Sequence, residues 1–178
     1  SILLIMYTFI FFLSAKLTHS DKDIKGSGIP QVEAELKGLM SLNWWSVLWK
    51  KYILGTLAIA SGLMLGREGP SIQLGAVGGK GIAKWLKASP VEERSLIASG
   101  AAAGLAAAFN APIAGLLFVV EEVYHHFSRF FWVSTLAASL VANFVSLLMF
   151  GLTPVLDMPD HIPQMSLDQY WIYLVMGI

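Results

Sequence analysis

Glu68 is the residue of this chain whose surroundings most strongly suggest chemistry. It lies within Gly66-Arg67-Glu68-Gly69-Pro70, after one uncharged stretch and before another. A proline in the first turn predicts that a helix begins here, and a helix start presents free backbone N–H groups and a positive dipole end that attract anions. An ionisable side chain at membrane depth is costly and usually lines an ion or proton path. We therefore interpret Glu68 as the occupant of an anion site, where its carboxylate competes with the anion.

Two further segments share this pattern, in which flexible or capping residues precede a proline. They are Gly26-Ser27-Gly28-Ile29-Pro30 and Asn110-Ala111-Pro112. Each predicts a non-helical backbone that leads into a helix N-terminus, although each alone would also fit a loop before an ordinary helix. If two such ends converge, their N–H groups replace part of an anion's hydration shell, and partial charges bind the anion weakly enough to release it.

A pair of adjacent acidic residues, Glu121 and Glu122, follows the long apolar run that ends at Val120. Adjacent residues of an α-helix point about 100° apart, so we expect one of the two carboxylates to face protein and the other water. The alternative is a pair of acids that marks a helix end at the membrane surface. Acids at a helix C-terminus oppose the helix dipole, which argues against a purely stabilising role.

The composition indicates a multi-pass integral membrane protein. Hydrophobic residues make up 56% of the 178 positions and charged residues only 13%, with a mean hydropathy of +0.64, and these values are too apolar for an ordinary soluble domain. The net charge of zero leaves no electrostatic basis for nucleic-acid binding. The chain contains no cysteine, which excludes disulfides and thiol chemistry within it. Both ends lie in apolar runs, so we expect them to be cuts through transmembrane helices.

The uncharged windows predict an all-α chain. Only 95–120 and 130–156 have the roughly 20 residues that a full membrane span needs, and shorter or interrupted windows are typical of discontinuous transporter helices. Buried core helices of a soluble protein are the alternative. The predicted helices lie near 2–15, 29–39, 45–65, 69–87, 91–108, 112–126, 130–150 and from 166 onward.

Small residues and charges refine this arrangement. Glycines four residues apart predict close helix packing at Gly62/Gly66, Gly75/Gly79 and Gly100/Gly104. Trp44, Trp45 and Trp49 fit an interfacial aromatic belt. By the positive-inside rule, the basic loops lie in the cytoplasm and the acidic stretch 151–170 lies outside. The basic residues used are Lys16, Lys22, Lys25, Lys80, Lys84, Lys87, Arg94 and Arg129.

Other functional patterns are weak. The stretch 78–81 resembles a phosphate loop but lacks its first glycine and its hydroxyl residue. His125 and His126 are adjacent and lack the spacing of a helical metal pair, so we expect no metal site, no cofactor and no enzymatic activity. Asp157, Asp160, His161 and Ser166 are adequately explained as part of a polar external loop.

Three segments of the sequence together resemble the CLC family of chloride channels and chloride/proton antiporters. The matching segments occur in the family's order and at its approximate spacing. They are 26–30, then 66–70 with Gln73 just beyond, then GAAAGLAAAFNAPIAGLLFVVEE over 100–122. The resemblance implies a bundle of tilted, partly discontinuous helices, with residues 1–178 forming one transmembrane domain that corresponds to the first of the family's two inverted repeats. Other chloride ligands of the family come from the second repeat.

The resemblance also implies roles for individual residues. Ser27 matches a hydroxyl that donates to a central chloride, and Glu68 matches the gating glutamate, which also carries protons. Glu122 matches the inner proton-transfer glutamate of the antiporters. The remaining implied chloride-binding positions are Gly28, Ile29, Arg67 and Gly69, although the Arg67 side chain could instead be a structural partner of carbonyls or of a nearby acid.

Together these roles imply chloride/proton antiport. The resemblance further implies a homodimer in a bacterial-type inner membrane, with lipid, chloride and protons as partners and an interface drawn partly from 112–126 and 130–150. The alternatives are a passive voltage- or pH-gated chloride channel, in which an acid at position 122 is untypical, and a non-transporting membrane scaffold.

Overall fold

The computed structural model describes residues 2–63, 66–124, 129–151 and 171, and all the regular structure in these ranges is helical. The elements are α1 (Ile2–Ser20), the short η1 (Lys22–Ile24), α2 (Ile29–Leu36), α3 (Trp44–Ala60), α4 (Glu68–Leu86), α5 (Pro90–Phe109), α6 (Pro112–Phe118), η2 (Val119–Tyr124) and α7 (Arg129–Phe150). The prediction of an all-α chain is confirmed over these residues. The helix expected from 166 onward, the loop 152–170 and His125/His126 lie outside them.

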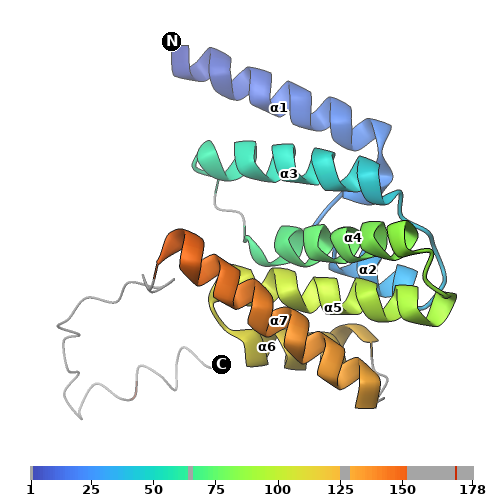
Figure 1. Cartoon of the computed structure of the whole chain (residues 1–178). Helices are drawn as coiled ribbons and strands as arrows, with labels where there is room; N and C mark the ends of the chain where they lie inside the picture. The colour runs from blue at the N-terminus through green and yellow to red at the C-terminus, as the bar shows by residue number, and fades with distance from the viewer. Residues whose placement is uncertain (1, 64–65, 125–128, 152–170, 172–178) are drawn as a thin grey trace.

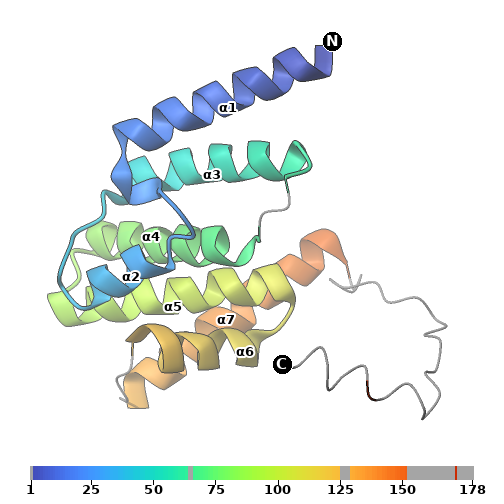
Figure 2. The ribbon, with the colours of Figure 1, turned by 180° about the vertical axis from the view of Figure 1, so that it is seen from behind.

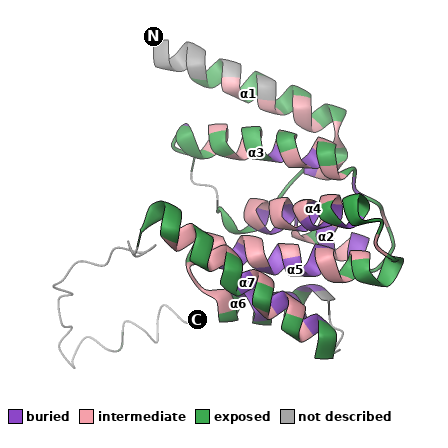
Figure 3. Cartoon of the chain, viewed as in Figure 1, coloured by how far each residue is buried: buried purple, intermediate pink, exposed green. Residues whose placement is uncertain are grey.

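The long helices stack in one order. In Figure 1, α1, α3, α4, α5 and α7 follow one another from top to bottom, and the view from behind in Figure 2 shows the short α2 lying against α4 and α5. The main packing partners agree with this view, because α4 packs on α3 and α5, and α5 packs on α6 and α7. Figure 3 shows that buried residues concentrate on α2, α4 and α5. The short helix α2 is therefore held by neighbours, as a helix of eight residues must be.

The crossing of α4 and α5 depends on glycine. A Cβ on Gly75 would meet the backbone carbonyl of Gly100, and one on Gly79 would meet that of Leu96. This confirms the packing prediction for Gly75/Gly79 and Gly100/Gly104. For Gly62 and Gly66 the prediction is wrong over the part of the chain that the structure describes, since a Cβ on either would meet none of its atoms within 4 Å.

Helix boundaries differ from the predictions where local sequence is ambiguous. Helix α1 continues to Ser20, beyond the end predicted near residue 15. Lys16 and His19 are exposed on the surface of this helix, so their polarity does not end it. Helix α2 ends at Leu36 and is followed by Gly38 with φ +73°. The predicted helix 112–126 divides into α6 and the π-helical turn η2.

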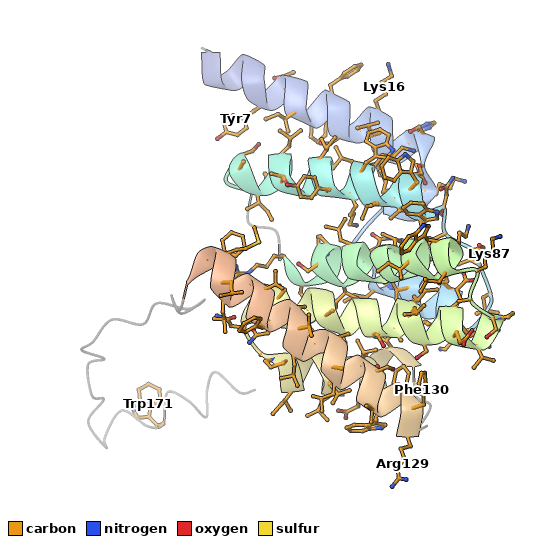
Figure 4. All side chains as sticks on the ribbon, in the orientation of Figure 1. Tyr7, Lys16, Lys87, Arg129, Phe130 and Trp171 are labelled. Atoms are coloured by element: carbon orange, nitrogen blue, oxygen red, sulfur yellow. The ribbon has the colours of Figure 1, made fainter. Side chains whose placement is uncertain are left out.

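Among the described residues, α7 alone combines the length and hydropathy of a membrane span, with a mean hydropathy of 1.9 and only 11% of its apolar window buried. The basic side chains Lys16, Lys87 and Arg129 all lie toward the right-hand end of the bundle in Figure 4. This distribution agrees with the expected orientation. Lys80, Lys84 and Arg94 lie in helices α4 and α5 and not in the predicted polar loop, and Lys80 differs from the exposed basic residues because it is only 2% exposed.

Candidate functional site

The first residues of α2 fold tightly against α4. Gly28, the N-cap of α2, is buried and has a left-handed φ of +97°, a region that favours glycine. A Cβ at this position would lie 2.6 Å from the side-chain amide carbon of Gln73. Glycine is therefore required here both by the backbone conformation and by the lack of space. Ser27, the residue before it, is exposed.

The first residues of α4 lie beside those of α2. Helix α4 begins at Glu68, and the next residue, Gly69, is buried. A Cβ on Gly69 would lie 2.7 Å from the Cβ of Ser27 and 2.9 Å from its carbonyl carbon. The condition stated for an anion site, that two helix starts converge, is thus met by α2 and α4. Their first N–H groups have no acceptor within their own helices and are available to an anion.

These two helix starts open onto one cleft of about 640 Å³. Ser27 and Glu68 both line it, and Glu68 is exposed within it. The other lining residues are Ser14, Thr18, Ile24, Gly26, Ile29, Lys51, Leu54, Gly55, Ala58, Gly66, Gly69 and Pro70. The cleft thus brings together a hydroxyl, a carboxylate and two helix N-termini. Of the predicted site residues, Ser27, Ile29, Glu68 and Gly69 meet here.

A buried lysine completes the wall of the cleft. Lys51 of α3 is 5% exposed, and its Nζ donates to the carbonyls of Gly26 at 2.7 Å and Ile24 at 3.1 Å. Its positive charge therefore lies beside the cleft and also holds the segment before α2. No role for Lys51 could be predicted from the sequence. The only signal was its position beside the long uncharged stretch that begins at Tyr52.

Gln73 holds the same segment from the other side. This side chain is fully buried, and its Nε2 donates to the carbonyl of Asp23 at 2.7 Å. Its Oε1 is buried without a hydrogen-bond partner among the described residues. Lys51 and Gln73 together fix the backbone that leads to Ser27 from two different helices.

Arg67 is directed differently from its two neighbours. Its guanidinium carbon lies 5.6 Å from the ring centre of Phe109, at the end of α5, which is a cation–π arrangement. The side chain is absent from the residues that line the cleft. This contact is compatible with the structural role left open by the sequence, with an aromatic ring as the partner in place of the expected carbonyl or acid.

The third predicted helix start forms but does not join this site. Asn110 ends α5 in the left-handed region with φ +56°, and α6 begins at Pro112, as predicted. Helix α6 packs on α5, α7 and η2. None of the residues 110–112 lines the cleft. The interruption at Asn110-Ala111-Pro112 therefore separates α5 from α6. The cleft is built by the starts of α2 and α4.

Glu121 and Glu122 lie far along the chain from the cleft, on η2. Both are exposed, so the expectation that one would face protein is wrong for the described residues. The reason is local, because this segment is a π-helical turn in which the apolar neighbours Val119, Val120 and Val123 take the buried positions. Such turns occur often at functional sites. The segment contacts α2 and leads toward Arg129, whereas Glu68 lies at the opposite end of α4 from Lys87, so the two acids lie toward opposite ends of the bundle (Figure 4).

Comparisons with known proteins identify the family of this chain. A family model described as voltage gated chloride channel matches residues 6–178. The chain is 40% identical over 156 residues to the H(+)/Cl(-) exchange transporter ClcA of Vibrio vulnificus (strain YJ016), which covers 85% of the chain and 33% of the relative. It is 38% identical over 175 residues to the protein of the same name from Vibrio cholerae serotype O1 (strain M66-2), covering 95% and 37%.

A solved structure shows the same fold. The crystal structure of a slow cyanobacterial Cl-/H+ antiporter matches with a TM-score of 0.83 at 33% identity, over 99% of this chain and 42% of that one. Fold and comparisons together define a helical integral membrane protein. The chain belongs to the voltage-gated chloride channel family, the CLC family, and has its all-α bundle. It spans about a third of the length of the curated relatives that it matches.

Proposed function

We propose that this chain is the first inverted repeat of a CLC chloride/proton antiporter and that residues 1–178 form one transmembrane domain within it. The observation that supports the proposal is the close approach of Ser27 and Gly69, together with the cleft that both Ser27 and Glu68 line at the starts of α2 and α4. Two relatives described as proton/chloride exchange transporters and one antiporter structure support the choice of substrates.

Chloride is held by neutral donors in this proposal. The Ser27 hydroxyl and the free N–H groups of residues 28–29 and 67–69 provide partial positive charge without a cationic side chain in direct contact. Lys51 contributes a positive potential from the cleft wall, although its three donors are directed partly to the carbonyls of Ile24 and Gly26. A site of this kind binds chloride and also releases it.

Exchange follows from competition for that site. Ionised Glu68 occupies the anion position, and a proton on Glu68 removes the charge that competes with chloride. Chloride binding therefore favours protonated Glu68, and protonation favours chloride binding, because the coupling between two ligands is reciprocal. Glu122, toward the other end of the bundle, passes the proton between Glu68 and the second aqueous side.

The complete protein is, in this proposal, a homodimer in a bacterial-type inner membrane. The outward face of α7 is apolar and suits either lipid or a second subunit, with Phe144 at 61% and Leu148 at 70% exposure. Helix α6 adds the exposed apolar side chains of Ile113 and Leu117.

The function is tested by Glu68→Gln in the complete protein reconstituted into vesicles, with chloride and pH recorded together. A neutral amide cannot carry a proton, so we expect proton movement to be lost and chloride flux to persist. Unchanged proton pumping in the variant contradicts the proposal. Chloride flux without proton movement in the wild type identifies a channel, and no anion flux from the wild type identifies a scaffold.

A further inference from the structure

Two buried polar side chains of α4 attach it to both ends of α2. Gln73 and Lys80 are 0% and 2% exposed, and seven residues separate them, so they lie on the same face of α4 about two turns apart. Gln73 donates to the carbonyl of Asp23, before α2 begins. Lys80 donates to the carboxylate of Glu35 in the last turn of α2. The segment that carries Ser27 is thus attached to one helix at two points.

Lys80 makes further contacts beyond the end of α2. Its Nζ donates to the carbonyl of Leu42 at 2.7 Å and to the hydroxyl of Ser41 at 3.0 Å, which together with Glu35 uses the three donors of the ammonium group. The Glu35 side chain is 7% exposed. Both charges of the pair are therefore removed from water, in a part of the molecule that does not line the cleft.

A buried ion pair of this kind contributes little net stability, because desolvation offsets the attraction between the charges. What distinguishes this pair from apolar contacts is that its hydrogen bonds are directional. The apolar contacts that hold α2, made through Val32 and Leu36, are non-directional and would allow this eight-residue helix to slide or rotate on its neighbours. The hydrogen bonds of Lys80 to Glu35 and Leu42 permit one position.

The position of α2 matters at its other end. A helix of eight residues is about 12 Å long and moves as a rigid body, so a shift at Glu35 is transmitted to Gly28, the N-cap that adjoins Ser27. At that end the packing is tight, since a Cβ on Gly28 or on Gly69 would overlap the opposite segment. A small displacement of α2 therefore changes where the Ser27 hydroxyl lies relative to Glu68.

We propose that Lys80, through its ion pair with Glu35, is a positioning residue for the anion site. The pair fixes α2 along and around its axis, and so fixes the Ser27 hydroxyl and the first N–H groups of α2 beside those of α4. Neither residue touches the anion. This inference rests on the proposed anion site at Ser27 and Glu68.

The experiment compares chloride binding by calorimetry with thermal unfolding in the complete protein. The double variant Glu35→Leu/Lys80→Met removes both charges and keeps apolar volume, so its unfolding midpoint stays near that of the wild type while its chloride affinity falls about tenfold. Lys80→Arg retains the charge and the donors, and it binds chloride within about twofold of the wild type. Lys84→Met is the matched control, because Lys84 is an exposed lysine one turn further along α4, and its affinity is unchanged.

A merely structural role of the pair would lower the unfolding midpoint together with the chloride affinity. A loss of affinity at an unchanged midpoint therefore identifies a positioning role. A folded double variant that binds chloride as tightly as the wild type overturns the proposal. If the double variant does not fold, Glu35→Asp decides, since it keeps both charges and shortens the acid by one methylene. Its affinity falls about threefold if the pair positions α2, and equal affinity overturns the proposal. A wild-type protein that binds no chloride contradicts the proposed function itself.

Discussion

Gly69 shows how a single missing methyl group creates the candidate site. We predict that Gly69→Ala pushes the starts of α2 and α4 apart, because its Cβ would lie 2.7 Å from the Cβ of Ser27 and 2.9 Å from the carbonyl carbon of Ser27. Chloride affinity falls about tenfold, measured by calorimetry on the purified protein. Gly78→Ala is the control, since a Cβ there meets no described atom within 4 Å and Gly78 does not line the cleft. Equal affinities for the two variants would show that the contact between the helix starts is unimportant.

Glu122 allows a test of the proton path at a position far from chloride. In Glu122→Gln we expect proton flux to fall at least about tenfold while chloride flux stays within about twofold, because an amide cannot exchange a proton and the anion site is untouched. Glu121→Gln is the matched control, since Glu121 is adjacent and equally exposed. Paired chloride and pH electrodes give both rates. Loss of proton movement in Glu121→Gln with normal movement in Glu122→Gln would reverse the assignment.

The junction between α1 and α3 depends on an ionised carboxylate. Burial alone would raise the pKa of Asp21, but hydrogen bonds from Lys50 and Ser46 outweigh it and hold the pKa below its usual 3.8. The folded state therefore favours the ionised form, and this stabilisation is complete above the unfolded pKa and is lost as the pH falls through the folded pKa.

It follows that Asp21→Asn lowers the free energy of unfolding by about 1 kcal/mol at neutral pH. The difference between wild type and variant is kept from neutral pH into acid and is lost as the pH falls through the folded pKa of Asp21, which lies below 3.8, because the carboxyl is then protonated in both states. Thermal unfolding across this pH range measures it. A difference that persists unchanged into acid would show that the two 2.7 Å hydrogen bonds from Lys50 and Ser46 do not depend on the charge.

The α4–α5 crossing gives a second prediction at the scale of the helix. Gly75→Ala places a Cβ against the backbone of Gly100 and destabilises the protein by about 1–3 kcal/mol through overpacking. Gly78→Ala, on the same helix, meets no atom within 4 Å and is expected to stabilise it by about 0.5–1 kcal/mol through helix propensity. Unfolding in detergent compares the two. Equal midpoints would mean that α4 and α5 can move apart without cost.

The elements themselves could be predicted largely from sequence, because glycine and proline signal helix starts locally. The starts of α2, α4 and α6 all follow this rule. Lys80 could not be placed in the same way. Its charge predicted a polar loop, and only Glu35, 45 residues away in the chain, allows it to be buried. Lys51 is similar, since its partners are backbone carbonyls that no side-chain pattern reveals.

Across the whole molecule, the end that carries Lys16, Lys87 and Arg129 is predicted to face the cytoplasm (Figure 4). This chain contains no cysteine, so a single Lys87→Cys substitution gives a unique thiol within it. A membrane-impermeant maleimide should label that thiol from the cytoplasmic side alone. Labelling of intact cells from outside would reverse the orientation, and Glu122 would then lie toward the outer end.

The proposed exchange mechanism depends most on one claim, that a halide and the Glu68 carboxylate compete for the cleft between the starts of α2 and α4. Bromide soaked into crystals of the complete protein tests it directly, because the anomalous signal of bromide locates the anion without assumptions about protein density. We expect a bromide peak beside residues 27–29 and 68–69 that strengthens in Glu68→Gln, where no carboxylate competes. A cleft without bromide in both proteins would contradict the account.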